Sequence, residues 1–223
     1  DVDFIAASFV RNADCIREIK AILRECDAPY TPVIAKIENA EGIENLDEIL
    51  EVADGIMVAR GDMGVEIPFE QVPVVQKQMI RKCNLVGKPV ITATQMLESM
   101  QENPRPTRAE VSDVANAVYD LTGAIMLSGE CAMGKYPVEC VETMVKISNA
   151  IESSVNYWGR FIKKGSRAEK SEDMDKNIAY TTCAMAEHIE ADAIATYTHT
   201  GNSVRKLAGM GAGCPIIAVT DDE

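Results

Sequence analysis

Short apolar runs that alternate with amphipathic segments constrain the fold of this chain more than any other feature. Each run has the length of a buried strand, and each following segment repeats apolar residues every three or four positions, as helices do. Parallel strands need such crossovers, so the alternation predicts an α/β fold with a parallel sheet. The expected strands cover residues 4–9, 33–39, 55–59, 89–93 and 124–127. The expected helices cover residues 13–26, 43–52, 74–86, 109–121 and 138–155.

Polar residues close each of the five apolar runs. Since the carboxyl ends of parallel strands meet at one edge of a sheet, these polar groups are expected to converge there. They are residues 10–12 (VRN), 36–38 (KIE), 60–62 (RGD), 94–95 (TQ) and 128–130 (SGE).

Lys36 and Glu38 end the second run and are the most informative pair. Strand side chains alternate faces with period two, so both charges are expected on one face while Ile37 points to the other. Asp62 follows the next run beside Gly61, whose backbone N–H is expected to be available to a ligand. A cation, two carboxylates and exposed amides suit a metal-assisted phosphate or enolate site. The alternative is an ordinary ion pair at a strand end and a turn or cap residue at Asp62.

Composition excludes several functional classes. The net charge is −13 and no Lys or Arg cluster forms a basic face, which argues against nucleic-acid binding. No apolar stretch reaches membrane-spanning length, and neither a signal peptide nor a low-complexity tract is present. The seven cysteines form no CxxC pair, so we interpret them as reduced packing residues.

A charged, glycine- and serine-containing stretch predicts a linker over residues 159–175. Beyond it, the pattern predicts helices at 174–189 and 203–210 and strands at 193–197 and 215–219, the start of a βαβ domain that ends unfinished. The turn at residues 198–203 (THTGNS) combines hydroxyls, a glycine and a helix start, which suits phosphate. Its alternative is a plain N-cap by Asn202 or Ser203.

Several long strings along the whole chain resemble the pyruvate kinase family. They are residues 35–39 (AKIEN), 57–68 (MVARGDMGVEIP), 92–100 (TATQMLESM), 104–110 (PRPTRAE) and 125–130 (IMLSGE). The resemblance implies that residues 1–158 form the last five β/α units of a (β/α)8 TIM barrel, followed by the linker at 159–175. Residues 176–223 would begin an α/β C-terminal regulatory domain. The first three barrel strands and a small lid domain would lie outside this sequence, and Asp1 suggests a piece of a longer chain.

The same resemblance implies phosphoryl transfer from phosphoenolpyruvate to ADP, giving pyruvate and ATP in the last step of glycolysis. Lys36 would stabilise charge in the transition state, while Glu38 and Asp62 would bind Mg²⁺ or Mn²⁺. The N–H groups of Gly61 and Asp62 and the hydroxyl of Thr94 would hold the substrate carboxylate, Thr94 also acting in catalysis. Ser128 would relay a proton to the enolate carbon.

Regulation and assembly are implied by resemblance alone. Thr198, Thr200, Gly201 and Ser203 match a sugar-phosphate effector site, where a nucleotide is a further possible effector. The resemblance also implies a cytoplasmic, allosteric homotetramer that requires K⁺. Because the K⁺ ligands and an arginine and asparagine near the first two barrel strands would lie outside these residues, we expect the segment alone to be inactive.

Two alternatives remain at this point. One is another metal-dependent barrel enzyme of phosphoenolpyruvate or pyruvate chemistry, an aldolase or a lyase, which would not predict the additional domain. The other is a non-catalytic fragment retained for assembly, although Lys36, Glu38, Asp62 and Thr94 are all intact.

Overall fold

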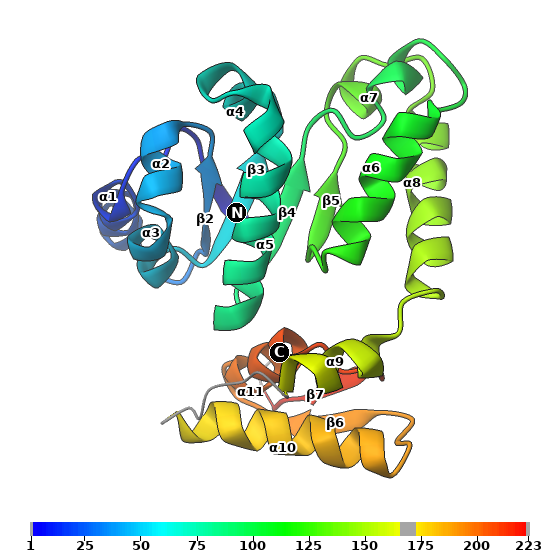
Figure 1. Cartoon of the computed structure of the whole chain (residues 1–223). Coiled ribbons are helices and arrows are strands. Elements are labelled where there is room, and N and C mark those ends of the chain that lie inside the picture. The colour runs from blue at the N-terminus through cyan, green and yellow to red at the C-terminus, as the bar shows by residue number, and fades with distance from the viewer. Residues whose placement is uncertain (1, 166–172, 222–223) are drawn as a thin grey trace. The chain divides into compact units, whose positions relative to one another are not determined.

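The computed structural model describes residues 2–165 and 173–221. They divide into two compact units, Asp1–Cys83 with Pro89–Ser154 and Asn84–Lys88 with Val155–Glu223. Each unit has its own parallel sheet and its own hydrophobic core (Figure 1).

The first unit is built on a five-stranded parallel sheet in which each strand pairs with the next along the chain. The strands are β1 (Ile5–Ala7), β2 (Val33–Ile37), β3 (Gly55–Ala59), β4 (Val90–Ala93) and β5 (Ala124–Met126). The sheet stays open in the described part of the chain, with β1 and β5 at its edges. The prediction of a partial (β/α)8 barrel with five β/α units is therefore confirmed.

Helices connect these strands, and most lie where the sequence predicted them. They are α1 (Ala13–Glu25), α2 (Ala40–Glu44), α3 (Leu46–Val52), α4 (Arg60–Glu66), α5 (Val72–Val86), α6 (Arg108–Tyr119), α7 (Gly129–Ala132) and α8 (Pro137–Glu152), with 3₁₀ turns η1 (Phe69–Gln71) and η2 (Glu98–Gln101). The prediction of a single helix over residues 43–52 was wrong, because Asn45 separates α2 from α3. The Asn45 side chain donates to the Arg11 carbonyl at 2.9 Å.

Asparagine side chains cap the first helix of each of the first two crossovers. The Asn12 carbonyl accepts from the N–H groups of Asp14 and Cys15, and the Asn39 carbonyl accepts from Gly42. Such caps satisfy donors that a helix start leaves without partners. They fix where each chain segment turns away from the edge of the sheet.

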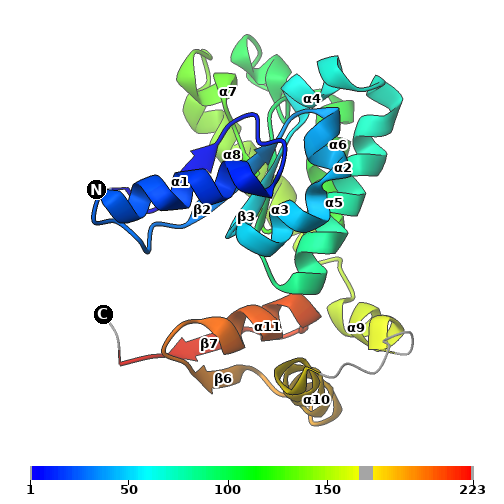
Figure 2. The ribbon, with the colours of Figure 1, turned by 90° about the vertical axis from the view of Figure 1, so that its left-hand side faces the viewer.

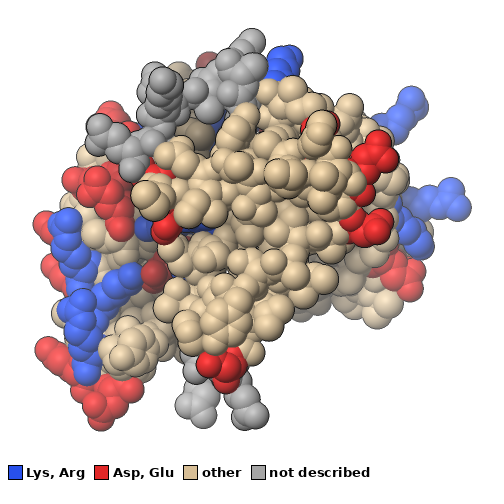
Figure 3. All heavy atoms as spheres, turned by 90° about the horizontal axis from the view of Figure 1, so that it is seen from below, with Lys and Arg blue, Asp and Glu red and all other residues tan. Residues whose placement is uncertain are grey.

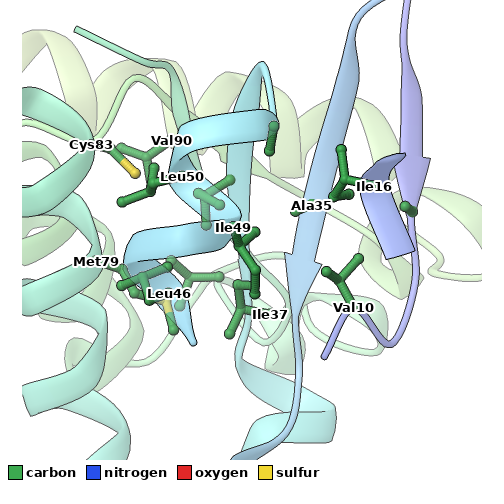
Figure 4. Packing of buried hydrophobic residues seen from close by; sticks show 14 of the residues in the cluster. Val10, Ile16, Ala35, Ile37, Leu46, Ile49, Leu50, Met79, Cys83 and Val90 are labelled. Carbon is green, nitrogen blue, oxygen red and sulfur yellow. The ribbon is translucent and has the colours of Figure 1, made fainter. Parts of the chain in front are cut away.

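The main core lies between the sheet and the helices that cover one face of it (Figures 2 and 4). Ile37 of β2 is fully buried there among residues from α1, α3 and α5, which include Ile16, Ile49, Met79 and Cys83. Ile34 belongs instead to a second cluster with Met57 and Ala93. The period of two places Lys36 on the Ile34 face, away from the covering helices.

The second unit contains α9 (Tyr157–Gly165), α10 (Met174–His188), β6 (Ile194–Tyr197), α11 (Asn202–Met210) and β7 (Ile216–Val219). Strands β6 and β7 pair in parallel, and Cys183 and Leu207 are buried in the core beside them. The predicted elements of this part are confirmed. Helix α9 occupies the first part of the predicted linker, and residues 166–172 of that linker lie outside the described residues.

Apolar side chains remain exposed along α10, namely Met174, Ile178 and Met185, and at its C-cap residue Ile189. Figure 3 looks onto the second unit and shows few charged side chains near the centre of the view. None of the helices in residues 2–165 and 173–221 is both long and apolar enough to cross a membrane.

None of the seven cysteines, all of which lie in the described part of the chain, forms a disulfide. Cys83, Cys140 and Cys183 are buried, as the packing interpretation requires, and burial raises the pKa of the Cys183 thiol to about 11. Cys26 and Cys131 are exposed, so the interpretation as packing residues is wrong for these two.

The start of α6 generates a pH-dependent prediction. Burial raises the pKa of Glu110, but hydrogen bonds from Ser99 and Thr107 outweigh that effect and hold it below its ordinary value of 4.5. The carboxylate therefore stabilises the folded state at pH above about 4.5, and this contribution is lost as pH falls through the lower folded pKa. We expect Glu110→Gln to lower the thermal unfolding midpoint at neutral pH and to match the parent in strong acid. An equal difference at every pH would contradict this account.

Candidate active site

The register of β2, β3 and β4 brings their polar ends to one edge of the sheet. Ile37 pairs with Val58, and Ala59 pairs with Ala93. The residues that follow β2, β3 and β4 therefore begin next to one another at the same edge of the sheet. The predicted convergence of strand ends is confirmed for these three strands.

Lys36 and Glu38 form an ion pair at this edge. Lys36 Nζ lies 2.7 Å from Glu38 Oε1, and the side chains are 24% and 0% exposed. Glu38 Oε1 is buried without a hydrogen bond, since the geometry of its contact with Lys36 is not that of one. Because its carboxylate is fully buried, this pair differs from an ordinary surface ion pair, in which both charged groups remain in water.

The loop after β1 supports both charges. The Phe9 N–H donates to Glu38 Oε2 at 2.7 Å, and Lys36 Nζ donates to Ser8 Oγ at 3.0 Å. Phe9 has φ of +54°, a left-handed conformation that a residue with a bulky side chain rarely adopts. This backbone strain is found where the amide reaches the buried carboxylate.

Gly61 and Thr94 meet across the ends of β3 and β4. The Gly61 N–H donates to Thr94 Oγ1 at 2.8 Å, and that hydroxyl donates to the Ala93 carbonyl at 2.7 Å. In this structure the Thr94 hydroxyl is the acceptor for the Gly61 amide, and binding of a ligand by that amide stays a prediction. A Cβ added at Gly61 would lie 3.4 Å from Thr94 Oγ1, so it would narrow the space beside the hydroxyl. Asp62 is exposed in the first turn of α4.

Ser128 lies at the N-terminus of α7 with its side chain exposed. Its N–H donates at 2.8 Å to Glu130 Oε2, while the Leu97 N–H donates at 3.1 Å to Glu130 Oε1. Glu130 is fully buried. One carboxylate thus joins the loops that follow β4 and β5, which carry Thr94 and Ser128.

Three residues that support the site, Ser8, Glu130 and Arg60, have no role predicted from the sequence. Ser8 was detectable as a hydroxyl near the end of the first apolar run, and Glu130 as the acid that closes the fifth. Arg60 is only 9% exposed and pairs with Asp113 of α6, 53 residues further along the chain. No local pattern indicates that pairing.

The carboxylates at this edge fit a divalent cation. Glu38 Oε1 is buried, faces the Lys36 ammonium at 2.7 Å and accepts no hydrogen bond, so it keeps lone pairs that a metal ion could share with Lys36. Within the described residues, no three His, Cys, Asp or Glu side chains cluster as a metal site. A cation that takes one or two protein carboxylates and completes its shell with water and substrate oxygens agrees with both observations.

The hydroxyl-rich turn of the second unit is closed by its own hydrogen bonds. Thr198 is 7% exposed, and its hydroxyl accepts from the Gly201 N–H at 3.0 Å. Gly201 has φ of +76° and precedes α11 without a side-chain cap, so the alternative of a cap by Asn202 or Ser203 is wrong. Thr200 is exposed, and Arg205 Nη2 donates to its carbonyl at 3.0 Å.

The buried carboxylate of Glu130 generates a local prediction. Glu130→Ala leaves the amides of Leu97 and Ser128 without their acceptor, and an unsatisfied buried donor costs about 1–3 kcal/mol. We expect hydrogen exchange of these two amides to become at least about tenfold faster. Glu98→Ala, an exposed neighbour, is the matched control and leaves both amides protected. Unchanged protection in Glu130→Ala would show that the carboxylate does not hold the loops.

Comparison with known proteins shows which family this chain resembles. A family model described as pyruvate kinase, barrel domain, matches residues 1–141, and one described as pyruvate kinase, alpha/beta domain, matches residues 176–223. The aldolase-like alternative does not predict the second match.

Three relatives named pyruvate kinase are similar over nearly the whole chain. The protein of Sporosarcina psychrophila is 54% identical over 222 residues, that of Clostridium acetobutylicum 51% over 225, and that of Dictyostelium discoideum 51% over 223. These matches cover 100%, 100% and 99% of this chain but 38%, 47% and 44% of the relatives. The chain therefore spans less than half the length of these curated relatives. Because the barrel model matches more than half of the chain, the chain belongs to the pyruvate kinase family.

Proposed function

We propose that the full-length protein containing this chain transfers a phosphoryl group from phosphoenolpyruvate to ADP, giving pyruvate and ATP in the last step of glycolysis. The observation that carries the proposal is the Lys36–Glu38 pair, in which a half-buried ammonium lies 2.7 Å from a buried carboxylate oxygen that lacks a hydrogen bond. A cation and an anion fixed together at one strand end suit a reaction that moves negative charge between oxygens.

In the proposed mechanism, Lys36 stabilises negative charge shared between phosphoryl and enolate oxygens. Its ammonium is held in place by Ser8 and Glu38, so little reorganisation is needed when that charge develops. Glu38 and Asp62 would hold Mg²⁺ or Mn²⁺, which when bound neutralises and orients substrate oxygens. K⁺ is the expected second cation, and no residue of this chain is assigned to it.

The substrate carboxylate is proposed to lie between the start of α4 and Thr94. The amides of Gly61 and Asp62 belong to the first turn of α4, where donors point away from the helix. The Thr94 hydroxyl would exchange its contact with the Gly61 amide for one with the carboxylate. Ser128, exposed at the neighbouring loop, is the proposed relay for the proton that reaches the enolate carbon.

The turn at Thr198, Thr200, Gly201 and Ser203 is the proposed effector site. The side chain of Arg205 reaches back over this turn, so a cation accompanies the hydroxyls at the start of α11. This combination favours a phosphate carried by a sugar or a nucleotide. A cytoplasmic homotetramer is proposed for the full-length protein on family grounds.

The direct test is pyruvate formation from phosphoenolpyruvate and ADP with Mg²⁺ and K⁺. We expect turnover by a full-length protein containing residues 1–223 and none by the 223-residue segment, whose sheet has two edge strands and no closed barrel. A folded but inactive full-length protein would favour the assembly role instead.

Lys36→Met should lower turnover in the full-length protein by at least about a hundred- to a thousandfold, the loss typical when one preorganised charge is removed. Lys77→Met, which removes an exposed lysine of α5, is the matched control and retains turnover. Steady-state kinetics and circular dichroism of both variants separate lost chemistry from lost folding. Normal turnover in Lys36→Met would remove this residue from the mechanism.

Glu38→Gln keeps the size of the side chain and an acceptor for the Phe9 amide but removes the charge. We expect its affinity for Mn²⁺, followed by electron paramagnetic resonance without substrate, to fall by about tenfold or more. Glu25→Gln, on the exposed surface of α1, provides the control for loss of one negative charge. Equal Mn²⁺ binding in both variants would exclude Glu38 as a ligand.

A further inference from the structure

The turn after β4 has an unusual backbone. Thr94 and Gln95 have φ values of +69° and +53°, so two consecutive residues other than glycine are left-handed. This conformation costs free energy for any residue with a Cβ, and most for a β-branched one such as Thr94. Surrounding contacts must therefore hold the turn.

The side chain of Arg60 supplies those contacts from the adjacent strand end. Its Nη2 donates to the Thr94 carbonyl at 2.6 Å, and its Nε donates to the Ala93 carbonyl at 3.3 Å. One planar guanidinium thus donates hydrogen bonds to two consecutive backbone carbonyls, and a lysine ammonium does not reproduce this geometry.

Arg60 is itself fixed from two helices. Its Nη1 donates to the Asp113 carboxylate of α6 at 2.8 and 2.6 Å and to Gln76 Oε1 of α5 at 3.4 Å. Gln76 is 5% exposed and the Arg60 side chain 9%, so the guanidinium is almost removed from water. Its position therefore follows the packing of α5 and α6 on the sheet.

The same chain segment holds Thr94 from both sides. The side chain of Arg60 binds the Thr94 backbone, and the backbone N–H of Gly61 binds the Thr94 hydroxyl at 2.8 Å. If the guanidinium is lost, Thr94 is free to return to an ordinary backbone conformation. Its hydroxyl would then leave the Gly61 amide.

We propose that Arg60 is a positioning residue for the substrate carboxylate. It acts through Thr94, by keeping the left-handed turn in the conformation that aims the hydroxyl at the space beside Gly61. This inference rests on the proposed pyruvate kinase reaction. It predicts that Arg60 governs the affinity for phosphoenolpyruvate and leaves that for ADP unaffected.

The test uses Arg60→Lys in a full-length protein containing residues 1–223. The lysine keeps the positive charge beside Asp113 but cannot donate hydrogen bonds to the carbonyls of both Ala93 and Thr94. We expect the KM for phosphoenolpyruvate to rise by about tenfold or more, with a smaller change in kcat and the KM for ADP within about twofold. Arg81→Lys, on the exposed side of α5, is the matched control and keeps all three constants.

A second substitution distinguishes positioning from a direct effect of charge. Glycine adopts positive φ without a Cβ penalty, so Gln95→Gly reduces the cost of the turn that Arg60 otherwise offsets. Added to Arg60→Lys, it is expected to restore at least about a third of the lost affinity for phosphoenolpyruvate. Three results would each overturn the proposal. They are an unchanged KM for phosphoenolpyruvate in Arg60→Lys, an equal rise in the KM for ADP, and a rise in the KM for phosphoenolpyruvate that Gln95→Gly does not reduce.

Failure of the reaction itself is recognised separately. If the parent protein makes no pyruvate, the proposed function fails before any variant is compared. If Arg60→Lys does not fold, Asp113→Asn replaces it, because this change removes the charge that orients Arg60 and keeps one acceptor. The expected result is then a rise of about three- to tenfold in the KM for phosphoenolpyruvate alone, and an unchanged KM overturns the proposal.

Discussion

Parallel pairing of β2, β3 and β4 is the constraint on which the site depends. Each crossover helix returns the chain to the same end of the sheet, so every strand of the first unit delivers its last residues to one edge. The site residues lie at the ends of three neighbouring strands, although they are spread over 58 positions of the sequence. They are Lys36, Glu38, Asp62 and Thr94. An antiparallel arrangement of the same strands would separate these groups.

Burial of charge distinguishes this edge from an ordinary polar surface. Glu38 and Glu130 are fully buried, and Arg60 is nearly so. Backbone amides hold the two carboxylates, and backbone carbonyls with Asp113 hold the guanidinium. Because burying an ion without partners is expensive, each ion orders the loop that satisfies it. Left-handed residues at Phe9, Thr94 and Gln95, each costing about 1–3 kcal/mol, lie in those same loops.

The second unit uses similar chemistry at its own strand end. There the chain turns through Gly201 into α11, and the buried hydroxyl of Thr198 accepts from the glycine amide. In both units a threonine hydroxyl accepts from the amide of a glycine near a helix start. In the first unit Arg60, the first residue of α4, donates to the Thr94 carbonyl, whereas in the second unit Arg205 of α11 donates to the Thr200 carbonyl.

The sequence by itself determined the order of strands and helices, the parallel sheet and the common face of Lys36 and Glu38. These features follow from the local periodicity of apolar residues, which can be read from a single sequence. The general right-handedness of crossovers between parallel strands supplies the rest. Tertiary structure decided that Asn45 divides a helix, that Thr94 occupies the Gly61 amide, and that Ser8, Arg60 and Glu130 support the site. Those contacts join residues 28 to 53 positions apart and depend on left-handed backbone angles. No short pattern encodes them, because the partner of each buried charge is chosen only when the strands and helices pack together.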